Sequence, residues 1–90
     1  MVDIDTFQGR VAVMIVARHE RRAGRLTRGQ LGTIREGLRN PEAAEAVAGA
    51  LVDAAEAMGA KVRTFQDWVQ WLMDNWEQIL QVILTILALL

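Results

Sequence analysis

The chain has 90 residues, of which 52% are hydrophobic and 23% charged, with one proline and no cysteine. This length allows one domain at most, the composition excludes an intrinsically disordered chain, and the lack of cysteine excludes disulfides and thiolate zinc sites. The net charge is −1, but residues 1–39 carry eight arginines against four acids, and residues 40–90 carry two basic residues against seven acids. This asymmetry favours an anionic partner at the basic end, or mutual neutralisation of the two halves within one fold.

The N-terminal segment, MVDIDTFQGR, carries two aspartates before its first arginine. A secretory signal needs a basic start, an apolar run and a small-residue cleavage site. We therefore expect no signal peptide, which leaves the cytoplasm, the periphery of a membrane or an assembled particle as locations.

Helix-start signals occur four times along the chain. Asp5 and Thr27 each stand three positions before a glutamine, and Thr64 is followed by an acidic first turn. Asn40 precedes Pro41, which suits the first position of a helix, and glycines follow the first and third segments as stop signals. We predict an all-α protein of four helices, at about 6–23, 28–38, 41–58 and 65–89.

The first predicted helix ends in an arginine-rich segment, ARHERRAGRLTR. Its arginines recur at helical spacing and form a basic stripe, which Arg28, Arg35 and Arg39 continue into the second helix. Guanidinium groups bind phosphate, so the stripe predicts contact with nucleic acid or lipid head groups. The candidate phosphate-binding residues are Arg18, Arg21, Arg22, Arg25 and Arg28. The alternative is a solvated face that pairs with the acids of the third helix, Glu42, Glu45, Asp53 and Glu56.

The third predicted helix is rich in alanine and has Gly49 near its centre. Small side chains allow another helix to approach closely along Ala46, Gly49, Ala50 and Asp53. Alanine is also the best helix former, so the composition has a simpler explanation as well.

The fourth predicted helix would be about 39 Å long, against about 27 Å for the first and third helices and about 17 Å for the second. We therefore expect its apolar end, ILQVILTILALL, to overhang the others by roughly 12 Å. A repeat of 3.5 residues places Asn75 as the one polar residue of an apolar seam, where it would set register and oligomeric state. The predicted docking interface comprises Trp68, Leu72, Asn75, Ile79, Val82, Ile83, Ile86, Leu87, Leu89 and Leu90.

Lipid is the alternative cover for this end of the chain. The apolar run spans about 18 Å, whereas a bilayer core is about 30 Å thick, so entry into one leaflet is easier than crossing. Trp68, Trp71 and Trp76 precede the run, where the tryptophans of an interfacial belt would lie.

An enzymatic role finds no support in the residue types. The chain has no Cys, Ser or Tyr, its glycines form no phosphate-binding loop, and His19 lacks the second histidine of a helical zinc motif. We expect no catalysis, cofactor, metal or small-molecule substrate.

These patterns predict a small helical domain at 1–63 with a basic N-terminal half and a docking helix at 64–90, together one structural unit. The predicted function is a non-enzymatic structural protein that self-associates, or joins a larger virion or membrane assembly, through its apolar C-terminal helix. One alternative is a membrane-inserting or pore-forming protein. Another is non-specific nucleic-acid binding through the arginine-rich end of the first helix.

Overall fold

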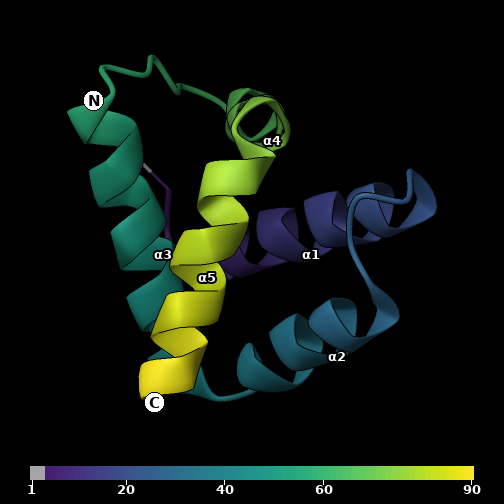
Figure 1. Ribbon diagram of the computed structural model, residues 1–90. Coiled ribbons are helices and arrows are strands. Elements are labelled where there is room, and N and C mark those ends of the chain that lie inside the picture. The colour runs from purple at the N-terminus through teal and green to yellow at the C-terminus, as the bar shows by residue number, and fades with distance from the viewer. Residues whose placement is uncertain (1–3) are drawn as a thin grey trace.

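The computed structural model describes residues 4–90, and in that range the protein is all-α, with no strand (Figure 1). Its helices are α1 (Thr6–Arg22), α2 (Arg28–Gly37), α3 (Pro41–Ala57), α4 (Phe65–Asp74) and α5 (Trp76–Leu89). The predicted fold class is confirmed, and the first three helices agree with their predicted bounds to within one residue. The predicted number of helices is wrong, because the fourth is divided into two. Asp3, which entered the charge balance, lies outside the described residues.

Side-chain caps begin four of the helices where the sequence predicts them. The Asp5 carboxylate accepts a hydrogen bond from the Gln8 backbone N–H at 2.7 Å, and the Asn40 side chain accepts one from Glu42 at 2.9 Å. Thr27 and Thr64 both form capping boxes, with Gln30 and Asp67 respectively. Each cap satisfies a backbone N–H that has no partner within the helix, which fixes the residue at which the helix begins.

Two glycines end helices in a conformation that other residues rarely adopt. Gly24, after α1, has a φ of +79°, and Gly59, after α3, has a φ of +70°. Both lie in the left-handed region, where a side chain would be strained, so each glycine ends its helix.

The predicted long C-terminal helix is interrupted at Asn75, which is the main correction to the predicted fold. Asn75 has φ −118° and ψ 24°, outside the helical region. Its backbone N–H and its side-chain amide both donate to the Trp71 carbonyl, at 3.1 and 2.9 Å. An asparagine side chain that bonds to the backbone competes with the helix, so α4 ends here and α5 begins in a new direction.

The break lets the two halves pack on different neighbours. α4 contacts α1, whereas α5 contacts α3 and α2 (Figure 1). A straight helix over 65–90 would be about 39 Å long, but the longest extent of the described residues is 33 Å. The apolar end therefore does not overhang. It folds back onto its own chain, with Leu87 lying directly over Gly37 at the end of α2.

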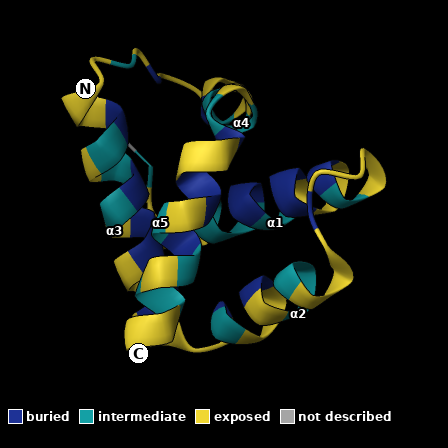
Figure 2. Ribbon diagram, viewed as in Figure 1, coloured by how far each residue is buried: buried dark blue, intermediate teal, exposed yellow. Residues whose placement is uncertain are grey.

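One hydrophobic core joins all five helices. Buried positions line the facing sides of α1, α3 and α5, and the outer sides are exposed (Figure 2). Trp68, Ile34 and Leu51 are among the largest fully buried side chains. The core includes residues on both sides of position 64, so the predicted docking segment supplies part of the interior.

Candidate functional site

Most of the predicted docking interface is turned toward the protein's own interior. Trp68, Leu72, Ile79 and Ile83 are at most 2% exposed and belong to the core, so a partner cannot reach them in this structure. The partly exposed members are Asn75, Val82, Ile86 and Leu87. Only Leu89 and Leu90 are well exposed, at 81% and 67%. The apolar side chains that predicted a docking tip are therefore used mainly to pack α4 and α5.

The three tryptophans do not form a belt on the surface. Trp68 and Trp76 are buried, and Trp71 is partly buried and stacks on Trp68 with ring centroids 5.3 Å apart. The indole N–H groups of Trp68 and Trp76 have no hydrogen-bond partner among residues 4–90, so packing alone holds these rings. No helix in the described part of the chain is both long enough and apolar enough to cross a membrane.

The arginines gather along a groove between α1 and α2. Two hollows, of about 400 and 660 Å³, lie between these helices and share Arg35 as a common wall. We call their combined surface the arginine groove. Its charged residues are Arg10, Arg18, Arg21, Arg22, Arg28, Arg35 and Arg39. The groove thus collects most of the positive charge of the protein on one continuous surface.

Helical spacing explains why these side chains meet. On α1, Arg10 and Arg18 stand eight residues apart and Arg21 follows three residues later, so all three lie on one side of the helix. Arg28 and Arg35 stand seven residues apart on α2, and Arg39 follows two residues after the helix ends. The two stripes face each other across the groove because α1 and α2 are packed together.

The floor of the groove is aliphatic. It is formed by Val11, Met14 and Ile15 from α1 and by Leu31 and Leu38 from the α2 side. Leu38 is buried, whereas Ile15 is 45% exposed, one of the few large hydrophobic residues that the chain leaves in solvent. The groove therefore offers apolar contact area between two charged rims.

Carboxylates neutralise little of this charge. The only ion pairs within residues 4–90 are Arg25 with Glu20 and Arg39 with Glu36. The second pair is 3.5 Å long with both side chains well exposed, and such surface pairs contribute little. The expected pairing of the stripe with the acids of α3 is therefore wrong for the described residues, because those acids lie on the exposed side of α3.

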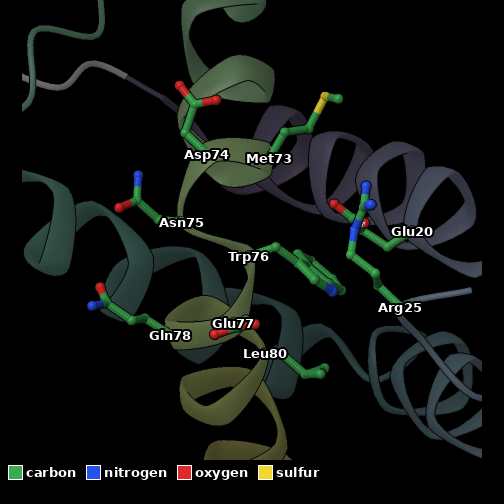
Figure 3. A pocket seen from close by; sticks show the side chains of 9 residues that line it. All are labelled: Glu20, Arg25, Met73, Asp74, Asn75, Trp76, Glu77, Gln78 and Leu80. Atoms are coloured by element: carbon green, nitrogen blue, oxygen red, sulfur yellow. Dashed lines mark hydrogen bonds and ion pairs between the residues drawn. The ribbon is translucent and has the colours of Figure 1, made fainter. Parts of the chain in front are cut away.

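Arg25 has a different role from the one its spacing predicts. The turn at Gly24 carries it away from the stripe, and its Nε donates to the Glu20 carboxylate, which is 2% exposed. Figure 3 shows the pair beside Trp76 at the break between α4 and α5. A hollow of about 540 Å³ lies here. Arg25 is the one basic residue that lines this hollow, and it is already bonded to Glu20. We therefore assign Arg25 a role in stabilising the fold and not in binding a ligand.

Three residues of the groove, Arg10, Arg35 and Arg39, were not among the phosphate-binding candidates. Arg10 lies two turns before Arg18, and its guanidinium also lies over the Phe7 ring at 5.7 Å. The signal that reveals all three is the shared spacing along two adjacent helices. The spacing can be recognised along each helix from the sequence, but the two stripes form one groove only because α1 and α2 pack side by side.

The groove can bind anions, because guanidinium groups form strong, directional hydrogen bonds to carboxylates and phosphates. Within residues 4–90 no three side chains of the metal-binding types lie close enough together to hold a metal ion. Comparison with protein-family models, with curated proteins and with solved structures returned no match.

Proposed function

We propose that the protein is a non-enzymatic assembly protein whose copies associate through the arginine groove. The observation that carries this proposal is the combination of seven arginines, nearly free of carboxylate partners, with an aliphatic floor on which Ile15 is exposed. Clustered like charges repel one another, and an anionic partner relieves that repulsion while it covers the floor.

The groove takes the role that the sequence predicts for the C-terminal tip. The tip residues other than Leu89 and Leu90 are largely engaged with α2 and α3, whereas Ile15 in the groove is 45% exposed and Met14 is partly exposed. An assembly contact needs apolar area that is accessible in the folded chain, and the groove supplies it.

A protein surface suits the groove better than a phosphate polymer does. Single-stranded nucleic acids are held by basic side chains together with aromatic rings on which the bases stack. The walls and floor of the groove contain no aromatic residue. A phosphate backbone would satisfy the arginines and leave the aliphatic floor uncovered, whereas an acidic helix with apolar side chains would cover both.

The test is the mass of the protein in solution at about 50 μM, measured by light scattering at about 50 mM and about 500 mM salt. We expect a mass well above the monomer value of 10.0 kDa at low salt, and a fall toward that value at high salt, because salt screens charge pairs. The variant Arg18→Glu/Arg35→Glu should be monomeric at both. Lys61→Glu/Arg63→Glu, which changes the net charge equally outside the groove, should behave like the wild type.

Self-association is rejected if the wild-type protein is monomeric at low salt. A single-stranded oligonucleotide should be titrated in parallel. If the wild-type monomer binds it with a steep salt dependence, and the groove variant does not, then the groove serves nucleic-acid binding instead.

A further inference from the structure

We infer that the surface that fills the arginine groove is the outer face of α3 of a second copy of this chain. This inference rests on the proposed self-association and adds the identity of the partner surface. We call that surface the α3 acidic face. It consists of Glu42, Glu45, Ala46, Gly49, Ala50 and Asp53, which line a shallow hollow of about 550 Å³.

The α3 acidic face is left uncovered by the fold. α3 packs into the core through the opposite side of the helix, with Val47, Leu51 and Ala55 buried. A Cβ atom added at Gly49 would meet no atom within 4 Å, so no other part of residues 4–90 covers the centre of this face. Its carboxylates form no ion pair within residues 4–90.

The two surfaces carry opposite charge and are similar in length, with three carboxylates on the α3 acidic face and seven arginines on the groove. Glu42 and Asp53 are eleven residues apart on α3, as are Arg10 and Arg21 on α1. Eleven residues of helix span about 16 Å in both cases. Carboxylates on the docked helix can therefore meet guanidinium groups along the whole groove, and the remaining arginines stay solvated at its rim.

The apolar parts are complementary as well. The floor of the groove presents the branched side chain of Ile15, which stands exposed. The centre of the α3 acidic face presents only Ala46, Gly49 and Ala50, so its ridge is low. A low ridge allows a large side chain to approach the helix backbone closely, and the acids that flank it then reach the charged rims.

A contact of this kind joins two different patches of the same chain. Within one molecule α3 is held in the core, so its outer face cannot reach the molecule's own groove. Each copy therefore offers one groove and one α3 acidic face, and copies join head to tail. Such heterologous contacts give closed rings or open filaments.

Two charge-reversal variants and their mixture test the inference. Arg18→Glu/Arg35→Glu disables the groove, and Glu45→Arg/Asp53→Arg disables the α3 acidic face. All four positions are exposed, and circular dichroism should show wild-type helix content for both variants. Each variant alone should associate about 100-fold or more weakly than the wild type, because like charges then face each other. An equimolar mixture should associate again, because each variant supplies the intact surface that the other lacks.

Matched controls separate this effect from net charge. Lys61→Glu/Arg63→Glu and Asp74→Arg/Glu77→Arg carry the same charge changes at exposed positions outside both surfaces, and should associate like the wild type. If the groove variant is monomeric but the α3 variant associates normally, the inference is overturned and the proposed function stands. If the mixture stays monomeric, the inference is likewise overturned. If neither variant loses association, both the inference and the proposed function are rejected.

Discussion

At the scale of single residues, the structure separates arginines that the sequence makes look alike. Arg18, Arg21 and Arg25 follow one helical spacing, yet only the first two line the groove. Arg25 follows the left-handed turn at Gly24, which points its side chain to Glu20. This pair contributes to the stability of the fold because the Glu20 carboxylate is buried, and a buried carboxylate needs a bonded partner in place of water.

Replacing Arg25 with alanine should destabilise the fold by about 1–2 kcal/mol, because it leaves a buried carboxylate without its cation. This is less than the about 3–5 kcal/mol of a fully buried pair, since the Arg25 side chain is 60% exposed. Urea unfolding should show a lower midpoint with an unchanged slope. Adding Glu20→Gln should recover part of the loss. Arg63→Ala, at an exposed arginine without an ion pair in residues 4–90, is the control. Equal stability of Arg25→Ala and Arg63→Ala would contradict the assignment.

At the scale of elements, the break at Asn75 decides which surfaces are free. A continuous helix would bury one side at most and leave an apolar end in solvent. Because the chain turns at Asn75, α4 covers α1 and α5 covers α3 and α2. Another helix pair, α1 and α3, meets closely where Gly9 faces Ala48.

The contact between α1 and α3 should not tolerate a large side chain at Gly9. A Cβ at this position would lie 3.0 Å from the Cβ of Ala48, which has no torsion that could move it away. Gly9→Leu should therefore lower the free energy of unfolding by about 1–3 kcal/mol through overpacking. Gly32 also lies in a helix, but a Cβ added there would have nothing within 4 Å. Gly32→Ala should therefore raise the free energy of unfolding by about 0.5–1 kcal/mol.

Denaturant unfolding at about 500 mM salt keeps self-association out of this comparison. If Gly9→Leu were as stable as the wild type, the close approach of α1 and α3 would have to be wrong.

At the scale of the whole molecule, charge is separated between surfaces that belong to different helices. The arginine groove lies between α1 and α2, and the α3 acidic face lies on the outer side of α3. Pairing within one molecule would neutralise the three acids and part of the arginine charge, but no ion pair within residues 4–90 joins the two surfaces. A chain of only 90 residues also buries a modest share of its surface when it folds. Association between copies would bury more surface and so stabilise the folded chain.

Self-association of the folded chain should make its melting temperature depend on concentration. A partner that binds only the folded state stabilises it by mass action, by up to about 1.4 kcal/mol for each tenfold rise in concentration. In a domain of this size such a gain raises the melting temperature by roughly 5–10 °C. Calorimetry at about 50 mM salt should show this rise, and at about 500 mM salt the melting temperature should be constant. A melting temperature independent of concentration at low salt would contradict association through charged surfaces.

The sequence by itself determined the first three helices and the start of the fourth, but not the break at Asn75. Asp5, Thr27, Asn40 and Thr64 satisfy the first backbone N–H groups of their own helices, and Gly24 and Gly59 end theirs by a local conformation. Caps and turns act within a few residues, so their chemistry can be read without the fold. The basic stripe was readable for the same reason, because spacing along one helix places side chains on one side.

Only the tertiary structure decided which of these sides are free. The apolar pattern of residues 68–83 is the same whether it faces a partner or the chain's own core, and the turn at Asn75 selects the core. Arg35 and Arg39, which the sequence already places on the basic stripe, face the arginines of α1 only because α1 and α2 pack together. Burial and the grouping of distant side chains depend on contacts between segments far apart in sequence, and no local pattern specifies those contacts.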